Sequence, residues 1–296
     1  MLDIKRMDKL IHLDVEAGTV TCETGMIFQT LEWYANEKGF SVMHMPSCLT
    51  CCTVGGALAH NGIGILSTKY GRMDDMTLNM EIVLPNGDII NTLPVPKHAA
   101  GPDLNQIFIG SEGTLAIICE AVLKLVPLPK VSVSLLVPFP DMKSAIESVP
   151  QIIGSKIIPT AIEYMSRDTI LFSESYLGKK FPDTKNDAYI LLTFDGNSQQ
   201  QVEQDLSVVA DLCLNIGALD AYIVDTEERK KTVWSARGAF LEAIKSSTTE
   251  MDECDVVVPG NQVDTFIKYT HELAEAFGVR IPSFGHAGDG NLHVYI

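Results

Sequence analysis

The stretch Thr53-Val-Gly-Gly-Ala-Leu-Ala-His-Asn-Gly-Ile-Gly64 concentrates glycine between apolar residues. Glycine lets a backbone approach a flat ring or a pyrophosphate closely, and successive N–H groups can form an anion-binding nest. The spacing is not the dinucleotide fingerprint, because it does not open a helix after one strong strand and no acidic residue follows in the right context. It is not a phosphate loop either, since no Gly-Lys-Ser/Thr ends it. The residues alone leave two interpretations open: a ligand cradle, or tight turns in a packed β-rich domain.

Short strands and turns surround this stretch. The hydrophobic pattern predicts two short strands over residues 10–22 and an amphipathic helix over residues 27–38. Residues 81–91 predict a hairpin, in which Asn86-Gly87 supplies the two positive φ values of a type I′ turn. A second glycine cluster, Gly110-Ser-Glu-Gly-Thr-Leu115, follows in apolar sequence.

The composition changes at residues 127–130, where two prolines indicate a linker. Beyond the linker, strands alternate with helices, and one of these helices is expected over residues 227–245. Alternation on this scale favours an α+β domain, with helices on one face of a sheet. We therefore expect two domains, over residues 1–128 and 129–296.

The overall composition narrows the class of protein. The chain has 296 residues, a formal net charge of −16, 46% hydrophobic residues and 20% charged residues. This excludes a disordered chain, which combines low hydrophobicity with a high charge fraction. The acidity disfavours nucleic acid and anionic membranes as partners, because both bind clustered basic surfaces. No run reaches the roughly 18 apolar residues of a membrane span, and the charged N-terminus is unlike a signal peptide, so we expect a cytoplasmic protein.

Four motifs together identify a family. Met45-Pro-Ser-Cys-Leu-Thr-Cys-Cys-Thr-Val-Gly-Gly-Ala57, Lys69-Tyr-Gly71, Asp103-Leu104 and Ile109-Gly-Ser-Glu-Gly-Thr-Leu-Ala116 resemble the FAD-linked oxidases of the vanillyl-alcohol-oxidase type. They are similar in particular to the D-lactate dehydrogenase and glycolate oxidase D-subunit branch. The resemblance covers nearly the whole chain. It implies a partial FAD-binding domain over residues 1–128 and a ferredoxin-like α+β substrate (cap) domain over residues 129–296.

The resemblance implies two segments that contact FAD. They comprise Pro46, Ser47, Thr53, Gly55, Gly56 and Asn61 in the first segment, and Gly110, Glu112, Gly113, Thr114 and Ile117 in the second. Backbone donors and bare glycine surfaces suit a cofactor with a pyrophosphate and a wide planar ring. The sequence departs from the family at Ile63 and Ala116, where glycine is usual. His60 is either an ordinary histidine beside the flavin loop or a covalent attachment point, which some relatives use.

The chain ends Phe284-Gly-His-Ala-Gly-Asp-Gly-Asn-Leu-His-Val-Tyr-Ile296, which predicts a hairpin that turns at Asp289-Gly290. In that register His286 would face His293 with Cβ atoms about 4.5–5.5 Å apart, so that both imidazoles could bind one divalent metal. Spacing alone favours the alternative, a turn flanked by two hydrogen-bonded histidines. The resemblance, in contrast, implies that both are ligands of Zn, Mn or Fe. In the family, a further carboxylate ligand and a catalytic histidine come from a Glu-His pair well downstream.

Trp234-Ser-Ala-Arg237, near the start of an expected helix, resembles the family's Trp-x-x-Arg. Without the family, Arg237 would be an exposed helix arginine. The resemblance implies that it clamps a substrate carboxylate, which a planar guanidinium suits. The implied reaction oxidises a small 2-hydroxy acid, D-lactate or glycolate, to the 2-oxo acid, with hydride passing to FAD while a metal on His286 and His293 polarises the hydroxyl. Electrons would then pass to an electron-transfer flavoprotein or an iron–sulfur subunit.

The alternative function is a non-catalytic fragment from a truncated or split gene. Family members have an Arg-Gly-Gly-Gly-like pyrophosphate loop before the position equivalent to Met1 and the Glu-His pair after the position equivalent to Ile296. The sequence contains neither. We therefore expect a chain that is truncated at both ends.

The seven cysteines are odd in number and irregularly spaced, which favours free thiols in a reducing compartment. Cys48, Cys51 and Cys52 form a cluster that could indicate zinc, iron–sulfur or redox chemistry. A structural metal site needs four ligands, however, and the other cysteines are scattered singly. Because the family usually has small residues at these positions, we interpret the three as small buried hydrophobic side chains.

Overall fold

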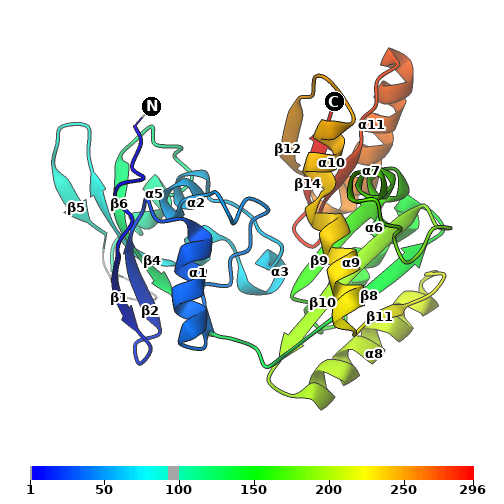
Figure 1. Ribbon diagram of the computed structural model, residues 1–296, viewed down its shortest axis with the longest axis horizontal. Helices are drawn as coiled ribbons and strands as arrows, with labels where there is room; N and C mark the ends of the chain where they lie inside the picture. Colours follow the sequence, from blue (N-terminus) through cyan, green and yellow to red (C-terminus); the bar gives the residue numbers. More distant parts are fainter. Residues whose placement is uncertain (1, 93–99) are drawn as a thin grey trace. The chain divides into compact units, whose positions relative to one another are not determined.

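The computed structural model describes residues 2–92 and 100–296 (Figure 1). The chain divides into two compact units, of which the first ends at Leu128 and the second begins at Pro129. Within the described residues, no helix combines the length and the apolar character that crossing a membrane requires.

The N-terminal unit is built on a five-stranded antiparallel sheet in the order β1-β2-β6-β4-β5. Its strands are β1 (Leu10–Asp14), β2 (Thr19–Glu23), β6 (Ile117–Lys124), β4 (Thr77–Val83) and β5 (Ile89–Asn91). A small separate sheet pairs β3 (Phe40–Ser41) with β7 (Val126–Pro127). The helices of the unit are α1 (Phe28–Glu37), α2 (Val54–His60), α3 (Ser67–Tyr70), α4 (Met73–Met76) and α5 (Asn105–Phe108).

One face of this sheet packs against helices. Phe28 and Leu31 of α1, together with Leu58 of α2, are fully buried in the same core as alternate strand residues such as Val20 and Met80. Alternation along strands and a single apolar stripe along α1 produce this one-sided burial. The predicted helix over residues 27–38 is therefore confirmed.

The predicted hairpin over residues 81–91 forms, because β4 pairs with β5. The predicted type I′ turn is wrong, since Gly87 has a φ of 89° while Asn86 is absent from the residues with positive φ. Pro85 explains the difference: its ring holds φ near −65°, which suits the second position of a type I turn. The loop is then a three-residue connection that places only Gly87 in the left-handed region.

The C-terminal unit contains a seven-stranded antiparallel sheet in the order β11-β8-β10-β9-β13-β14-β12. Its strands are β8 (Val131–Phe139), β9 (Ala161–Ser166), β10 (Ala188–Gly196), β11 (Tyr222–Val224), β12 (Glu253–Val257), β13 (Ser283–His286) and β14 (Asn291–Tyr295). The first four follow the spatial order β11-β8-β10-β9, with α6 (Met142–Gly154) after β8 and α8 (Gln199–Asn215) after β10. This arrangement is the ferredoxin-like split βαβ. It confirms the α+β fold class.

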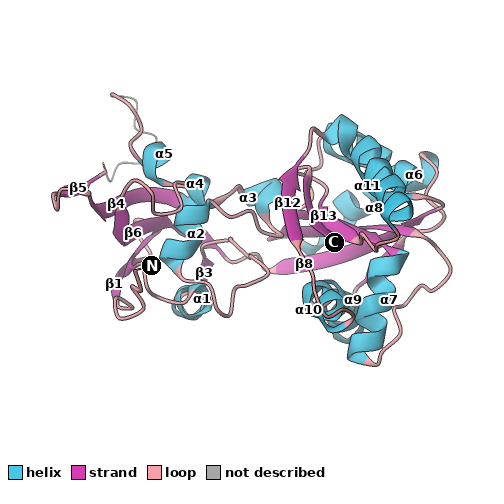
Figure 2. Cartoon of the chain, turned by 90° about the horizontal axis from the view of Figure 1, so that it is seen from above, coloured by secondary structure: helices cyan, strands magenta, loops and turns pink. Residues whose placement is uncertain are grey.

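The expectation of helices on one face only is wrong, because helices cover both faces of the second sheet (Figure 2). The two amphipathic helices α6 and α8 pack on one face together with α11 (Val263–Phe277). The other face is covered by α7 (Arg167–Leu177), α9 (Glu227–Gly238) and α10 (Phe240–Ser246). The strands accordingly read as nearly continuous apolar runs, and β10 is buried from Ala188 to Phe194. Apolar runs of this kind do not indicate which face of the sheet, if either, is exposed to solvent.

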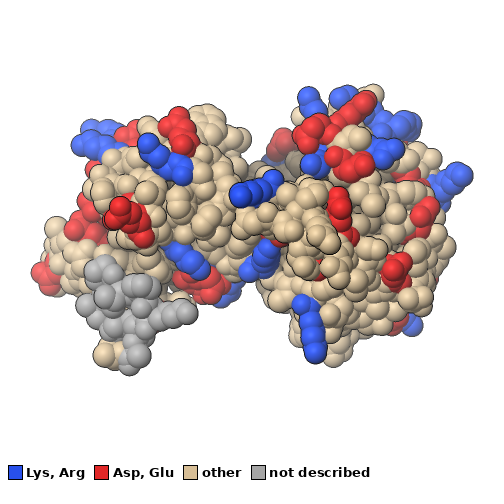
Figure 3. All heavy atoms as spheres, turned by 90° about the horizontal axis from the view of Figure 1, so that it is seen from below, with Lys and Arg blue, Asp and Glu red and all other residues tan. Residues whose placement is uncertain are grey.

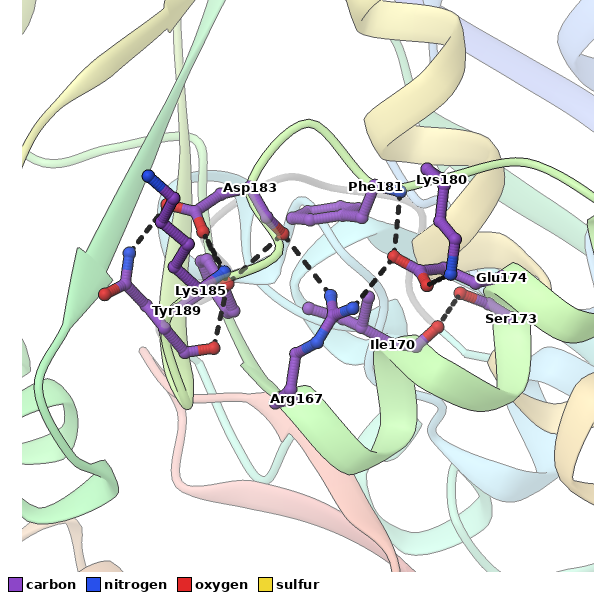
Figure 4. Close-up of polar contacts among 10 residues, drawn as sticks. Arg167, Ile170, Ser173, Glu174, Lys180, Phe181, Asp183, Lys185 and Tyr189 are labelled. Carbon is purple, nitrogen blue, oxygen red and sulfur yellow. Dashed lines mark hydrogen bonds and ion pairs between the residues drawn. The ribbon is translucent and has the colours of Figure 1, made fainter.

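A buried polar network fixes the segment between α7 and β10 (Figure 4). Glu174 is nearly buried, and its carboxylate accepts from Arg167 Nη2 at 3.1 Å and from Lys180 Nζ at 2.8 Å. The other arm of the Arg167 guanidinium, Nη1, donates to the carbonyl oxygen of Asp183 at 3.3 Å. Arg167 therefore ties the start of α7 to the segment that leads into β10.

Charges of both signs are distributed over the surface. On the face drawn in Figure 3, the described acidic and basic side chains are intermixed. That face therefore offers no broad basic surface of the kind that nucleic acid binds.

Candidate active site

The two glycine segments of the N-terminal unit lie side by side. The amide of Gly110 donates to the carbonyl oxygen of Leu58 at 3.0 Å, and the amide of Glu112 donates to that of Ala59 at 2.9 Å. Both acceptors belong to the last turn of α2, whose carbonyl groups have no i+4 amide within the helix, and the carbonyl oxygen of Leu58 also accepts from the amide of Asn61 at 3.1 Å. The second segment thus satisfies the end of the helix that the first segment forms, and the structure brings the two predicted flavin segments together.

Most of the predicted flavin residues are accessible. Ser47, Gly56, Gly110, Glu112, Gly113, Thr114 and Ile117 are exposed, whereas Pro46, Thr53 and Asn61 are half-buried. A Cβ added at Gly113 would meet no atom within 4 Å, so the backbone there faces open space. Ile117, at the start of β6, is 39% exposed and could present an apolar surface to a planar ring.

Three residues of the first segment have evident structural roles. Gly55 is buried, and a Cβ added to it would lie 3.0 Å from both Cβ and the carbonyl oxygen of Thr24. Thr53 caps α2, because its Oγ1 accepts from the amide of Gly56 at 3.0 Å. Asn61 ends the same helix in the left-handed conformation, with a φ of 51°, and its side-chain oxygen accepts from the amide of Asp74 at 3.2 Å. These residues shape the loop whether or not they contact a cofactor.

The predicted site residues of the C-terminal unit converge on one side chain that the sequence did not single out, Glu163 of β9. Glu163 is fully buried. One of its oxygens, Oε2, lies 2.7 Å from Arg237 Nε and 2.6 Å from Arg237 Nη2, while Oε1 lies 2.6 Å from His286 Nδ1. Sheet register explains the second contact, since Glu163 and His286 are directly opposed on neighbouring strands.

This cluster determines the protonation of its members. Burial alone would raise the pKa of Glu163, but His286 and Arg237 outweigh it and hold that pKa well below its usual range. An ionised carboxylate can only accept hydrogen bonds, so His286 Nδ1 carries the proton in this contact. With its Nδ1 facing Glu163, His286 would use Nε2 to coordinate a metal, as in carboxylate–histidine–metal arrangements.

Arg237 lies in the last turn of α9, not near the start of a helix as predicted. The single helix expected over residues 227–245 is also wrong, since it is interrupted at Ala239 between α9 and α10. The Arg237 side chain is 4% exposed, and its guanidinium carbon lies 4.6 Å from the ring centre of Phe284. Because two of its nitrogens face Glu163, a substrate carboxylate would share this guanidinium with Glu163.

The register predicted for the terminal hairpin is wrong. His286 is opposed by Asn291 and Phe284 by His293, so the turn occupies residues 287–290 instead of two residues. Gly290, with a φ of 71°, is held against β12 because its carbonyl oxygen accepts from the amide of Val258 at 2.9 Å. The shift keeps His286 and His293 on one face as a diagonal pair. Their ring centres are 5.4 Å apart.

His293 is largely buried, and burial lowers its pKa to about 4 despite the opposing attraction of Asp255. Its Nδ1 has no hydrogen bond, although carboxylate oxygens of Asp255 and Glu253 lie 3.6 and 3.9 Å away. A neutral imidazole with an unused buried nitrogen is suited to bind a metal. Tyr295, two residues further along β14, donates to Glu253 at 2.9 Å.

The two histidines are therefore compatible with the predicted metal site, but they do not form a complete set of ligands. Across residues 2–92 and 100–296, no group of three or more His, Cys, Asp or Glu side chains is arranged to hold a metal ion. Catalytic zinc sites in general use three protein ligands. Of the proposed ligands, the structure brings His286 and His293 together and supplies Glu163 as the outer partner of one of them.

Two cavities of the C-terminal unit lie away from this cluster. One of about 740 Å³ is lined by parts of α7, α10 and α11, and a neighbouring one of about 320 Å³ shares Phe172 and Arg280 with it. Glu163, Arg237, His286 and His293 line neither cavity. Cavity size therefore does not identify the site in this unit.

Comparison with known sequences agrees with these features. Residues 128–296 match the FAD linked oxidases, C-terminal domain, and residues 1–93 match an FAD binding domain. The chain is similar to a D-lactate dehydrogenase of Anaerostipes hadrus, with 39% identity over all of this chain and 63% of that protein. It is 34% identical to the glycolate oxidase subunit GlcD of Bacillus subtilis, over 99% of this chain and 62% of the relative. The chain thus spans somewhat under two thirds of the length of these curated relatives.

A solved structure of p-cresol methylhydroxylase with substrate bound has a TM-score of 0.78 and 17% identity, covering 99% of this chain and 64% of that one. At this identity the likeness concerns the fold, which is the vanillyl-alcohol-oxidase type. The family match covers all of the C-terminal unit, and the FAD-binding match covers most of the N-terminal unit. The chain belongs to the FAD-linked oxidase family.

Proposed function

We propose that the protein takes part in the FAD-dependent oxidation of a small 2-hydroxy acid, D-lactate or glycolate, to the 2-oxo acid. The observation that carries this proposal is the convergence of Arg237, His286 and His293 on one face of the second sheet, around the buried Glu163. The names of the D-lactate dehydrogenase and glycolate oxidase relatives support the substrate class.

Different residues of the chain would bind the cofactor, the substrate and the metal. The two flavin segments, over residues 46–61 and 110–117, would hold FAD, which accepts the hydride when bound. Arg237, fixed by Glu163, would hold the substrate carboxylate through its remaining donors. His286 and His293 would hold a divalent metal, Zn, Mn or Fe, which supplies a Lewis acid for the hydroxyl oxygen. The Glu163 contact would keep the His286 ring oriented for this task.

We also propose that electrons leave through a protein acceptor, an electron-transfer flavoprotein or an iron–sulfur subunit. Support comes from the relative that is named as a subunit of glycolate oxidase. A cytoplasmic location is proposed from the cysteines, because all seven are free.

Flavin binding and reduction test the proposal directly. The chain, reconstituted with FAD and freed of excess cofactor, is expected to show the visible flavin band, and anaerobic D-lactate or glycolate with Mn²⁺ is expected to bleach it. Arg237→Lys keeps a charge beside Glu163 but loses the bidentate fork, so we expect the substrate concentration for half-maximal bleaching to rise roughly tenfold. Arg229→Lys, an exposed change on the same helix, is the matched control and should not shift it.

The outcomes separate the two candidate functions. Absence of a flavin band would contradict FAD binding by this chain. A flavin band that neither hydroxy acid bleaches, with or without metal, would favour the non-catalytic fragment.

Metal binding is tested separately by calorimetry with Mn²⁺ or Zn²⁺ on the chelator-treated protein. We expect His293→Ala to lower the affinity at least about tenfold, because it removes one of two imidazole ligands. His271→Ala changes an exposed histidine of the same unit and serves as the control. Equal affinity in the two variants would show that His293 is not a ligand.

A further inference from the structure

Three thiols lie within one turn of the N-terminal unit. The amides of Cys51 and Cys52 both donate to the carbonyl oxygen of Cys48, at 2.9 and 2.8 Å, which closes a helical turn over residues 48–52. The interpretation of these cysteines as buried hydrophobic side chains is wrong, because Cys48 and Cys51 are exposed and Cys52 is half-buried. Apolar packing therefore does not account for the cluster.

The turn places Cys48 and Cys52 on the same side of the backbone. Residues four apart in a helical turn are neighbours, with Cα atoms separated by about 6 Å, a distance that a disulfide can span. Their side chains are close enough for each to shift the pKa of the other. The Cys51 thiol instead donates to the carbonyl oxygen of Cys48 at 3.3 Å. Because the Cys51 thiol is engaged with the backbone, we expect Cys52 to be the partner of Cys48.

The two thiols differ in acidity. The neighbouring Cys52 side chain, aided by the charge of His60, lowers the pKa of Cys48 to about 6, whereas the Cys48 side chain raises the pKa of Cys52. At neutral pH, Cys48 is therefore mostly thiolate, the nucleophilic form, and Cys52 keeps its proton. An exposed thiolate beside a second thiol is the arrangement of a redox-sensitive pair.

The turn is anchored on both sides. The carbonyl oxygen of Cys52 accepts from the amide of Phe28 at 2.9 Å, and that of Leu49 accepts from the amide of Gln29 at 3.2 Å. These bonds tie the turn to the start of α1, and Thr53, which caps α2, follows directly. The pair is thus held in place and not carried on a loose loop.

We propose that Cys48 and Cys52 form a reversible redox modification site that reacts with peroxides. The Cys48 thiolate attacks a peroxide oxygen, the O–O bond breaks, and the leaving oxygen takes a proton from solvent, which leaves a sulfenic acid on Cys48. The Cys52 sulfur then forms the S–S bond, and the sulfenic oxygen leaves as water. In sum, two thiols and one hydrogen peroxide give one disulfide and two waters. A thiol reductant reverses the reaction.

The test treats the reduced full-length chain with one equivalent of hydrogen peroxide and maps the products by mass spectrometry. We expect a Cys48–Cys52 disulfide that a thiol reductant reverses. Cys52→Ser should accumulate sulfenic acid at Cys48, which dimedone traps, whereas Cys51→Ser should still form the disulfide. Alkylation of Cys48 should increase with pH around a midpoint near 6.

Cys254 is the internal control, since it is an exposed thiol that stands alone in the sequence. Peroxide should oxidise Cys48 at least about fivefold faster than Cys254, because the lowered pKa of Cys48 makes it mostly thiolate at neutral pH. Equal rates at the two positions would overturn the proposal. So would a disulfide from Cys48 to Cys51, or irreversible oxidation of Cys48 while Cys52 is present.

Discussion

Replacement of Glu163 by Gln is expected to lower the free energy of unfolding of the C-terminal unit by about 3–5 kcal/mol, the usual cost of removing one partner from a buried ion pair. Gln has nearly the same shape as Glu, so the packing around this side chain is unchanged. The variant leaves the Arg237 guanidinium, 4% exposed, without its counter-charge. Urea unfolding followed by Trp234 fluorescence measures the effect, in a Trp33→Phe background that leaves Trp234 as the only tryptophan.

Two further variants separate charge from shape. Glu147→Gln removes an exposed carboxylate paired with Lys143 on α6 and should cost less than about 1 kcal/mol. Glu163→Gln combined with Arg237→Met removes both buried charges and should recover most of the lost stability. If Glu163→Gln costs no more than Glu147→Gln, the buried cluster does not hold the unit together as described.

The pH dependence has a defined sign. The pKa of Glu163 is lower in the folded protein than in the unfolded chain. Between these two pKa values the unfolded state binds more protons, so the free energy of unfolding rises with pH. The stabilisation by Glu163 is complete above its unfolded pKa of about 4.3 and is lost as the pH falls through the lower folded value. The stability difference between the native chain and Glu163→Gln should therefore shrink on acidification below about pH 4.

The sequence was sufficient for the fold where periodicity is strong. The helix over residues 27–38 and the hairpin over residues 81–91 form where the pattern predicts them, and the second unit alternates strands with helices as expected. The sequence pattern was insufficient where a single residue or backbone contact determines the geometry of a turn. Pro85 selects the turn type of one hairpin, and the turn of the other is four residues long, with Gly290 hydrogen-bonded to Val258 directly after β12. Contacts of this kind depend on neighbouring segments that the local pattern does not contain.

The sequence likewise predicts only part of the candidate site. Arg237, His286 and His293 stand in recognisable motifs, but Glu163, which holds two of them, does not. One signal could have indicated it: a lone carboxylate within an apolar strand, Ala161–Ser166, is almost never buried unless it is paired. Its partners lie 74 and 123 residues away in the sequence, and only the sheet order places β9 beside β13.

Gly285→Ala is expected to destabilise the C-terminal unit by about 3 kcal/mol or more, because the new methyl group would press on backbone and not on a movable side chain. An added Cβ would overlap the carbonyl oxygen of Asn291 and lie 2.9 Å from Leu292 Cα. To admit it, β13 and β14 must move apart, which also separates His286 from His293. Trp234 fluorescence in urea measures the stability, and calorimetry with Mn²⁺ measures the loss of metal affinity.

Gly238→Ala is the matched control for this change, since it makes the same substitution next to Arg237. Gly238 is exposed in α9, and a Cβ added there would meet nothing within 4 Å. Alanine should stabilise that helix by about 0.5–1 kcal/mol, because glycine loses more conformational entropy on folding. Opposite signs for the two substitutions would establish that the glycine in Gly285-His286 is required by the close approach of two strands. If Gly285→Ala stays within about 1 kcal/mol of the native chain, β13 and β14 are not packed as closely as described, and the placement of the two imidazoles is wrong with them.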